Sequence, residues 1–477
     1  MRKMLIGREQ EIAMLEGYAQ SGRAEFVAVY GRRRVGKTFL VNQLFAGRLT
    51  FTMTGVMDGD KRAQMHAFMD AMDMSGNTLQ KAPHDWYEAF QQLRRYLTAQ
   101  MEKTEGRTIV FIDELPCLDT RNSDFISALG YFWNSWASLQ ERLMLIVCGS
   151  ATSWMMKNII DSHGGLHNRI THEMHLHEFT LHEVESYFHA NNFVWDRLMV
   201  LQTYMVMGGV PYYLSLLDPA KSLAQNIDHL FFRPDGEMRR EFQRLYKTLF
   251  STPEPYITII ETLFNRKQGM TRDEIAKATG KDANGRLTQI LQNLVDSDIV
   301  RFYHTKQKKI SARGGIYQLM DFYSIFYLQF VNGKASDEYF WTKSLNTPLV
   351  NNWLGLSFER VCLSHIQQIK QALHIDTIRT AHFAWRSNDA IQKAQIDMVI
   401  ERADRMVNVC EAKYSERPYL IDKSEYERLQ DRIALYQQQT NTKGGILPTF
   451  ITTYGLQRNA YSEHIPCSIS LDGLFTN

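Results

Sequence analysis

The sequence predicts an α/β protein of several domains, and three observations lead to this expectation. A length of 477 residues corresponds to about three domains of roughly 150 residues each. Hydrophobic residues make up 44% and charged residues 22%, which is ordinary for globular proteins and excludes a largely disordered chain. In the first 180 residues, short apolar runs alternate with helical patterns, which is typical of buried parallel strands joined by helices.

Four apolar runs are too short for helices and rich in β-branched and aromatic residues, so we expect strands at 26–30, 51–54, 109–112 and 143–147. A fifth strand is expected at 174–179. These elements define a predicted core at residues 1–180. From about residue 181 to residue 250 the pattern becomes helical, and we treat this segment as a separate helical domain.

Residues 251–335 and 336–477 predict two further domains. In the first, a capping box at Thr271–Glu274 opens a short helix, Gly280 marks a turn, and a second helix is followed by strands at 299–303 and 315–319. This order is typical of a winged helix. The second begins with a helix from about residue 345. Strands then follow at 395–400, 406–413 and 446–453, with a polar helix at 423–438, which predicts a small α/β domain.

Charge and cysteine content exclude some classes of protein. Lys+Arg is 54 and Asp+Glu is 52, so the net charge of 54 − 52 = +2 excludes a uniformly basic surface. Five cysteines with no C-x-x-C spacing favour neither a disulfide framework nor a zinc ribbon. The uncharged stretch 198–217 is long enough to span a bilayer, but Gly208, Gly209 and Pro211 interrupt it. We expect two buried helices there, no membrane partner and a cytoplasmic location.

The strongest motif is the Walker A pattern G-R-R-R-V-G-K-T, which lies between a predicted strand and a predicted helix. Its glycines let backbone N–H groups surround phosphate oxygens, and the helix N-terminus adds positive potential. We expect Lys37 to reach the β/γ-phosphates and Thr38 to ligate Mg²⁺. A glycine turn that happens to carry Lys-Thr is the alternative. The expected nucleotide-binding residues are Gly31, Arg32, Arg33, Arg34, Val35, Gly36, Lys37, Thr38 and Phe39.

A matching Walker B pattern follows at 109–114, where an apolar strand ends in two acids. Asp113 is expected to hold Mg²⁺ and Glu114 to orient and deprotonate the attacking water, unless the two acids only cap the next helix. Ser150, at the end of the next strand, is either a sensor of the γ-phosphate or a helix N-cap. Arg169 is an arginine finger, a sensor or an ordinary surface residue; a finger supplied in trans would require a homo-oligomer.

Together with Ile6–Glu9 and the corner Gly208–Pro211, these motifs resemble the archaeal-type ATPases, near the AAA+ and STAND branches of P-loop NTPases. The resemblance implies a P-loop sheet with a helical lid at 181–250, ATP as the nucleotide, a winged helix and a C-terminal domain similar to PD-(D/E)XK nucleases, that is, restriction-endonuclease-like. It also implies that Gly7 and Arg8 lie near the base and that Pro211 contacts the nucleotide from the lid.

A second set of chemical residues lies in the last domain. Glu411 and Lys413 are two apart on a predicted strand and therefore share a face, and a hairpin would bring Asp397 beside Glu411. Two carboxylates can bind Mg²⁺, Glu359 on the preceding helix could complete the metal site, and Lys413 can position water or stabilise charge on phosphate. This arrangement resembles the PD-(D/E)XK nuclease core. The alternative is a set of solvated strand residues.

Basic residues without an intervening acid fill the expected wing, and the expected recognition helix carries polar side chains. They predict contact with nucleic acid, with DNA as the expected type, unless the winged helix serves only protein packing. The candidates are Arg286, Lys306, Lys308, Lys309 and Arg313. Several histidines cluster between residues 163 and 182, among them His175 and His177. They are interpreted as structural because they match no metal-binding motif.

These motifs lead to two functional hypotheses. The first is an ATPase coupled to DNA binding and to Mg²⁺-dependent cleavage of nucleic acid. The second is a nucleotide-switched DNA-binding or scaffold ATPase whose nuclease-like domain does not cleave.

Overall fold

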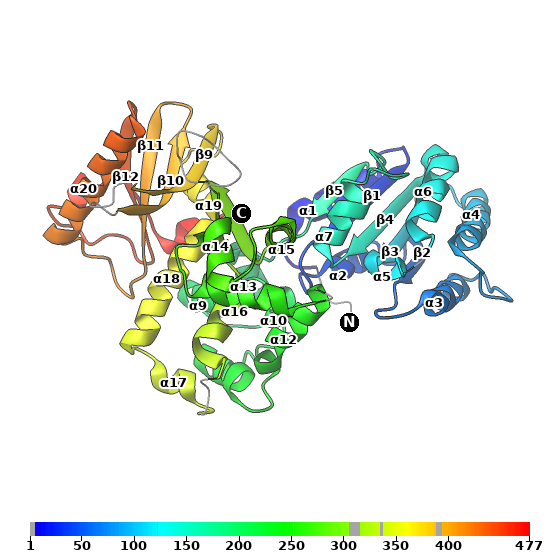
Figure 1. Ribbon diagram of the computed structural model, residues 1–477, viewed down its shortest axis with the longest axis horizontal. Helices are drawn as coiled ribbons and strands as arrows, with labels where there is room; N and C mark the ends of the chain where they lie inside the picture. Colours follow the sequence, from blue (N-terminus) through cyan, green and yellow to red (C-terminus); the bar gives the residue numbers. More distant parts are fainter. Residues whose placement is uncertain (1–4, 122, 251, 305–314, 334–336, 388–393) are drawn as a thin grey trace. The chain divides into compact units, whose positions relative to one another are not determined.

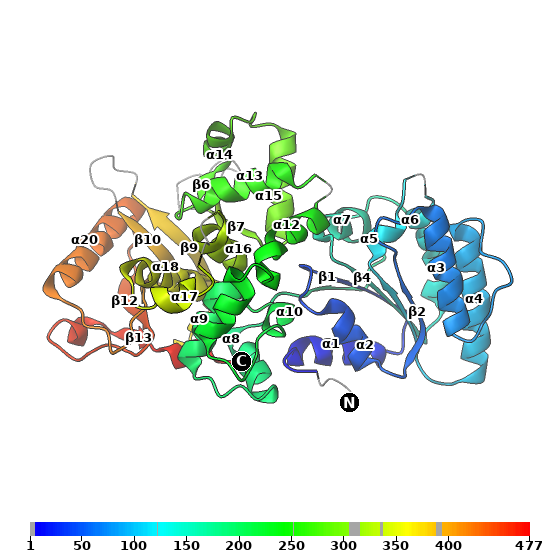
Figure 2. The same cartoon turned by 90° about the horizontal axis from the view of Figure 1, so that it is seen from below.

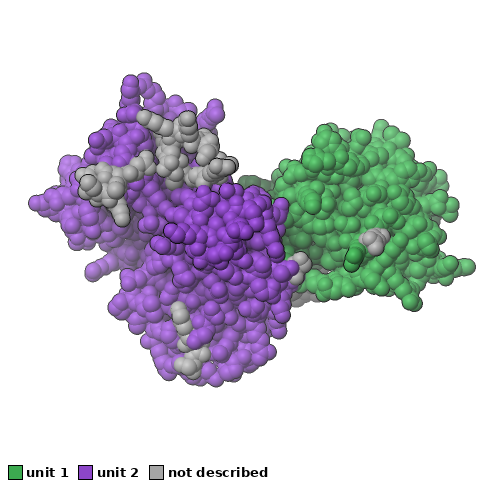
Figure 3. Space-filling view, viewed as in Figure 1, with its two compact units in different colours: residues 1–178, 249–251, 296–298 green, residues 179–248, 252–295, 299–477 purple. Residues whose placement is uncertain are grey.

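The computed structural model of the chain describes residues 5–121, 123–250, 252–304, 315–333, 337–387 and 394–477. The chain divides into two compact units (Figure 3). Unit 1 comprises Met1–Glu178, Leu249–Ser251 and Asp296–Asp298, and unit 2 comprises Phe179–Thr248, Thr252–Val295 and Ile299–Asn477. Each unit is described by itself below.

Unit 1 is built around a five-stranded sheet in the order β2-β3-β4-β1-β5, in which every pair of neighbours is parallel. The strands are β1 (Glu25–Tyr30), β2 (Leu49–Thr54), β3 (Thr108–Asp113), β4 (Leu143–Gly149) and β5 (His172–His175). The predicted parallel α/β sheet is therefore confirmed. The fifth strand lies at His172–His175 instead of the expected 174–179. It is an edge strand that begins with the polar residues His172 and Glu173, so its start does not form an apolar run.

Helices cover both faces of this sheet (Figures 1 and 2). Helices α1 (Glu9–Ala19) and α2 (Lys37–Leu44) pack against one face through a core that includes Val27 and Val29. Helices α3 (Lys61–Met74), α4 (Trp86–Lys103) and α6 (Phe125–Ser135) cover the face that carries Phe26 and Ala28. Short helical segments complete the unit: α5 (Leu115–Leu118), η1 (Ala137–Leu139), α7 (Thr152–Met155) and η2 (Met156–Ile160).

Unit 2 begins with a helical segment. Its elements are α8 (Leu181–Ala190), α9 (Arg197–Met207), α10 (Pro211–Leu214), α11 (Leu223–Ile227), η3 (Asp228–Phe232) and α12 (Glu237–Leu249), the last of which ends in the part assigned to unit 1. The stretch 198–217 forms two helices with a corner, as expected, because Gly208 adopts φ 69° and α9 ends there. Within the described ranges, we find no helix with the length and apolar character needed to cross a bilayer.

The next segment of unit 2 has the order helix, strand, helix, helix, strand, strand. These elements are α13 (Glu254–Phe264), β6 (Met270–Thr271), α14 (Arg272–Thr279), α15 (Gly285–Asp296), β7 (Val300–His304) and β8 (Gly315–Leu319), and the strands form a sheet in the order β6-β8-β7. The expected capping box is present, since the Thr271 and Glu274 side chains bond reciprocally to backbone N–H groups. Helix α13 and strand β6 were not expected. Three aromatic-rich helical segments follow: α16 (Phe322–Phe326), η5 (Tyr327–Val331) and α17 (Phe340–Ser344).

The last part of unit 2 carries a mixed five-stranded sheet in the order β13-β12-β11-β10-β9 (Figure 1). Its strands are β9 (Thr380–Arg386), β10 (Gln395–Arg402), β11 (Met406–Lys413), β12 (Gly445–Thr452) and β13 (Cys467–Ile469). Helix α18 (Pro348–Ser364) packs against β11, and α20 (Lys423–Thr440) packs against the face that carries Val399 and Val409. The remaining helices are α19 (Ile366–Ala372), η6 (Ser462–His464) and η7 (Leu471–Leu474).

Candidate functional site

The Walker A loop connects β1 to α2 in the expected place. Two glycines and one arginine have positive φ angles, at Gly31 (140°), Arg34 (72°) and Gly36 (93°), and this backbone is the kind that turns successive N–H groups inward. Gly31 has a packing reason as well, because a Cβ atom there would lie 2.3 Å from the Leu176 carbonyl oxygen. Arg32 and Val35 are buried, Arg33 and Arg34 are half-buried, and Phe39 is exposed on α2.

Lys37 is the first residue of α2, and its side chain is folded under the loop. Its Nζ donates to the carbonyl oxygens of Gly31 and Arg32, at 2.9 Å each. Burial lowers the pKa of this ammonium, while Glu114 and Asp113 act in the opposite direction. The loop carbonyls therefore hold a buried cation at the helix N-terminus, where a phosphate is attracted.

Thr38 and Asp113 come together across the sheet. The Thr38 hydroxyl donates to Asp113 Oδ2 at 2.7 Å, and Asp113 Oδ1 accepts from the Glu114 N–H at 2.9 Å. The hydroxyl and the carboxylate were both expected to hold Mg²⁺, and the structure brings them into contact. Two oxygen donors of this type are the ligands that Mg²⁺ uses at nucleotide phosphates.

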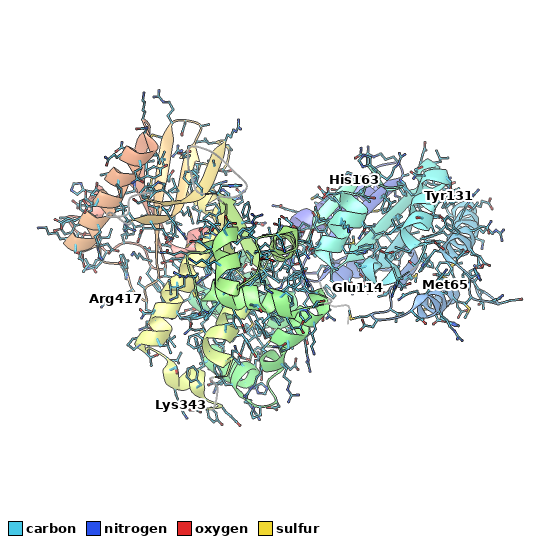
Figure 4. The ribbon with its side chains drawn as sticks, in the orientation of Figure 1. Met65, Glu114, Tyr131, His163, Lys343 and Arg417 are labelled. Carbon is cyan, nitrogen blue, oxygen red and sulfur yellow. The ribbon has the colours of Figure 1, made fainter. Side chains whose placement is uncertain are left out.

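Glu114 lies at the carboxyl end of β3 (labelled in Figure 4) and is held there by Ser150. The Ser150 hydroxyl donates to Glu114 Oε2 at 2.9 Å, and the Ser150 N–H approaches the same oxygen at 3.4 Å. Glu114 occupies the N-cap position of α5 but makes no side-chain capping bond, and the N-cap of α7 is Ala151 rather than Ser150. The capping alternatives for both residues are therefore wrong, and Ser150 orients the acid expected to activate water.

Arg8 is the N-cap residue of α1 and is almost fully buried, with φ 67° like its neighbour Gly7. Its guanidinium donates to the carbonyl oxygens of Val35 (3.2 Å) and His177 (2.6 Å). Arg8 therefore ties the start of the chain to the Walker A loop. The expected contact of Gly7 and Arg8 with the base stays a prediction.

The roles expected for Arg169 and Pro211 stay predictions. Arg169 is exposed in the segment before β5, and its backbone N–H donates to the Leu166 carbonyl oxygen. Pro211 is the first residue of α10 in unit 2, so its expected contact with the nucleotide also stays a prediction.

The acidic residues of the C-terminal sheet gather on neighbouring elements. Strands β10 and β11 are antiparallel with Met398 opposite Cys410, and continuing this register by one residue places Asp397 opposite Glu411. Burial, together with the charges of Asp397 and Glu411, raises the pKa of Glu359 on α18 to about 7. The three carboxylates are therefore electrostatic neighbours. They do not, however, converge within 4.8 Å of one another in the described coordinates.

Glu411 and Lys413 are not solvated strand residues, because both are half-buried and paired. Lys413 Nζ lies 2.9 Å from Glu411 Oε1 and 2.9 Å from Glu425 Oε1, and Arg432 Nη1 lies 2.9 Å from Glu411 Oε2. Burial alone would lower the pKa of Lys413, but Glu411 and Glu425 raise it. Asp397 is exposed and accepts a hydrogen bond from the Gln395 amide.

A pocket of about 820 Å³ opens beside these residues, between the sheet and α20. Sequence reasoning missed its helical wall, where Glu425, Arg428 and Arg432 line the pocket. Their spacing of three and four residues puts them on one face of α20, and this periodicity was the signal that could have found them. Two further arginines lie close to Asp397: burial lowers the pKa of Arg360 to about 10 and also lowers that of Arg301, while Asp397 acts against both shifts.

Of the expected nucleic-acid contacts, Arg286 is exposed near the start of α15. Lys306, Lys308, Lys309 and Arg313 lie outside the residues that the structure describes. A groove of about 800 Å³ runs beside α14 and is lined by four basic side chains that sequence reasoning did not select: Arg266, Lys267, Lys277 and Arg386.

Comparison with known proteins found similarity in the N-terminal part of the chain. Residues 5–217 match a family described as an ATPase domain predominantly from Archaea. A relative described as an uncharacterized protein of Methanocaldococcus jannaschii is 24% identical over 370 residues, which cover 77% of this chain and 78% of the relative.

Two solved structures of low similarity were also found. One is the Walker-type ATPase of Pyrococcus abyssi (17% identity, TM-score 0.47, covering 69% of this chain and 97% of that one). The other is the ORC2 protein of Aeropyrum pernix (13% identity, TM-score 0.41, covering 69% and 95%).

The matched range contains the Walker A loop, the Thr38–Asp113 contact and the Ser150–Glu114 pair. Residues 5–217 are therefore similar to an ATPase domain found predominantly in Archaea, and the protein is an ATP-hydrolysing enzyme.

Proposed function

We propose that this ATPase binds nucleic acid through a winged helix in unit 2 and cleaves it, in a Mg²⁺-dependent reaction, at the Glu359–Asp397–Glu411–Lys413 site. The observation that carries the proposal is the register of β10 and β11, whose pair Met398–Cys410 lies directly beside Asp397 and Glu411, with β11 packed against the helix that bears Glu359. DNA is the expected nucleic acid.

In the ATPase domain, different residues are proposed to bind the phosphates, to accept a proton from water and to hold the metal ion. The carbonyl-held Lys37 is placed to meet the β- and γ-phosphates, and Glu114 is placed to accept a proton from water while Ser150 fixes its carboxylate. Thr38 and Asp113 would hold Mg²⁺, because both offer oxygen ligands that already lie 2.7 Å apart. Bound there, Mg²⁺ would neutralise charge on the phosphates.

The order of elements from α13 to β8 supports a winged helix. Its third helix, α15, leaves Arg286, Thr288 and Gln289 exposed, which are side chains able to reach phosphates or base edges. The basic groove beside α14 adds Arg266, Lys267, Lys277 and Arg386, and its one acid, Glu274, is engaged in the capping box. A concave, positively charged surface of this kind favours a phosphate backbone.

The donor set of the C-terminal site also suits Mg²⁺, since Glu359, Asp397 and Glu411 offer carboxylate oxygens only. Burial, followed by the charges of Asp397 and Glu411, raises the pKa of Glu359, and a divalent cation bound beside it would favour the ionised carboxylate. Bound Mg²⁺ would supply charge stabilisation to a phosphodiester, and Lys413 would add a positive charge next to it.

The decisive experiment is a cleavage assay on the full chain with labelled single- and double-stranded DNA and RNA, with Mg²⁺ or Mn²⁺, in the presence and absence of ATP. We expect the wild type to cut and Asp397→Ala to lose cutting while its ATPase rate is unchanged. The matched control is Asp404→Ala, an exposed acid in the turn between the same two strands. A wild-type protein that cuts none of these substrates would refute cleavage.

One specific observation favours a second candidate, a nucleotide-switched nucleic-acid-binding ATPase that does not cleave. The Glu411 carboxylate is taken up by Lys413 and Arg432 rather than directed at Asp397 and Glu359. Under this candidate, DNA binding responds to ATP, and Lys37→Ala abolishes the response. Cleavage would be absent in the wild type under every metal condition.

A further inference from the structure

Two histidines and one aspartate of unit 1 converge at the end of β5. His175 and His177 are two residues apart and project to the same side, and their ring centroids are 3.9 Å apart. His175 Nε2 and His177 Nδ1 each lie 3.1 Å from the same atom, Asp298 Oδ2. Of all described His, Cys, Asp and Glu residues, these three form the one group whose ligand atoms lie within 4.8 Å of one another.

We propose that His175, His177 and Asp298 bind a divalent transition-metal ion of the zinc type. The distances fit this ion, because two ligands bound at about 2.0–2.1 Å at a tetrahedral angle lie roughly 3.3 Å apart. Two imidazoles and one carboxylate leave a fourth position for water. The His177 side chain is 60% exposed, so that position has access to solvent.

The backbone around the site is built to bring the three groups together. Asp298 has φ 57°, a left-handed conformation that non-glycine residues rarely adopt, and it holds the carboxylate against β5 from the turn between α15 and β7. His175 stacks on Tyr30 with ring centroids 4.8 Å apart. Arg8 fixes the His177 backbone through its carbonyl oxygen.

One buried nitrogen of this cluster lacks a well-aligned hydrogen bond. His175 Nε2 is inaccessible to solvent and makes no well-aligned hydrogen bond, although Asp298 Oδ2 lies 3.1 Å away. Buried polar atoms are rarely left in this state, and one explanation is an ion that takes up the nitrogen lone pair. The positive charge of Arg8 opposes the binding of a cation at this site, because it also acts on His177.

The site lies directly behind the Walker A loop. Tyr30, which stacks on His175, precedes Gly31, and a Cβ atom on Gly31 would come within 3.3 Å of His175 Cδ2. A bound ion would therefore fix the end of β5 against the strand that carries the phosphate-binding loop.

The test is a calorimetric titration of the full chain, without a histidine tag and freed of metal by a chelator, with ZnCl₂. We expect a saturable site with one Zn²⁺ per chain, and Co²⁺ in its place should give the absorption bands of a tetrahedral ion. His177→Ala and Asp298→Asn should each weaken Zn²⁺ binding by at least about 100-fold. Asparagine tolerates the left-handed backbone at position 298, so this variant is expected to fold.

The matched control is His163→Ala, which removes an exposed histidine of the same unit (Figure 4) that stands near His167 but near no carboxylate of the proposed site. Zn²⁺ affinity should be unchanged in this variant. If the wild type binds no Zn²⁺ in a saturable way, or binds it equally well after His177→Ala and Asp298→Asn, the three residues are a hydrogen-bonded charge cluster only and the proposal is wrong.

Discussion

Replacement of Glu359 by glutamine tests whether the C-terminal site holds excess negative charge. Burial and the charges of Asp397 and Glu411 raise the pKa of this carboxyl to about 7 in the folded protein, against an ordinary value of 4.5. The folded state therefore binds a proton more tightly than the unfolded state. Below pH 4.5 Glu359 is neutral in both states and does not lower the free energy of unfolding. The destabilisation grows as the pH rises from 4.5 to 7 and is fully present above 7.

The magnitude follows from the two pKa values. The difference between 7 and 4.5, multiplied by about 1.4 kcal/mol per pH unit, gives about 3 kcal/mol of lost stability once the pH exceeds 7. Glu359→Gln keeps the size of the side chain and removes the charge. We expect a gain in the free energy of unfolding of about 3 kcal/mol at pH 8 and of less than about 1 kcal/mol at pH 5.

Thermal unfolding at the two pH values measures this difference. For cooperative unfolding of all 477 residues, about 3 kcal/mol corresponds to an increase in Tm of about 3 °C at pH 8. Glu427→Gln is the control, because Glu427 is an exposed residue of α20 whose pairing with Lys423 is worth only about 0.5 kcal/mol. Its Tm should change little at either pH.

Mg²⁺ provides the second arm of the experiment. If the three acids share an ion, Mg²⁺ at pH 8 should raise the Tm of the wild type, and chelation should reverse the increase. The gain should be small in Glu359→Gln. A Glu359→Gln variant that is no more stable than the wild type at pH 8 would contradict the charge distribution described for this site.

Three further predictions concern the ATPase domain and the corner of unit 2. Ser150→Ala frees the Glu114 carboxylate, so kcat for ATP hydrolysis should fall by about 10- to 100-fold with little change in nucleotide affinity; equal losses in both would contradict an orienting role. Lys37→Met should abolish turnover without lowering Tm, because it replaces a buried ammonium by an apolar side chain of similar length; an active variant would refute the role given to Lys37. Gly209→Ala should destabilise the protein by about 3 kcal/mol in urea unfolding, since its Cβ would lie 2.0 Å from the Phe179 carbonyl oxygen; an unchanged midpoint would show that this corner can relax.

The buried strands of each sheet and the edge strand β2 could be predicted from the sequence, whereas the edge strands β9 and β13 could not. Strands β1, β3 and β4 are buried along their whole length and read as unbroken apolar runs. Strand β9 is partly exposed and polar, and β13 has only three residues, so neither carries a pattern that distinguishes it from a loop. Edge strands are defined by their hydrogen-bonded neighbour, which the local sequence does not contain.

The candidate sites also contain some residues that the sequence could predict and others that depend on the tertiary fold. Lys37, Thr38, Asp113 and Glu114 were predictable because a short motif fixes their chemistry and the elements around it. The pairing of Ser150 with Glu114 depends on β3 and β4 being neighbours in the sheet, which no spacing reveals. The convergence of Asp298 on His177 joins residues 121 positions apart, so the histidines alone matched no metal-binding spacing.

The two acidic sites of this protein differ in how their charges are balanced. At the Walker site, the Thr38 hydroxyl donates to Asp113 and the Ser150 hydroxyl donates to Glu114. At the C-terminal site, Lys413 and Arg432 pair with Glu411, whereas burial and the charges of Asp397 and Glu411 raise the pKa of Glu359 to about 7, although Arg360 and Lys413 act in the opposite direction. A cation that bridged Glu359 and Asp397 would therefore gain most where the existing ion pairs do not reach. Cleavage and simple binding therefore differ in one physical quantity, the affinity of this pair of acids for Mg²⁺. The increase in Tm that Mg²⁺ gives at pH 8, compared between the wild type and Glu359→Gln, measures that affinity without assuming either activity.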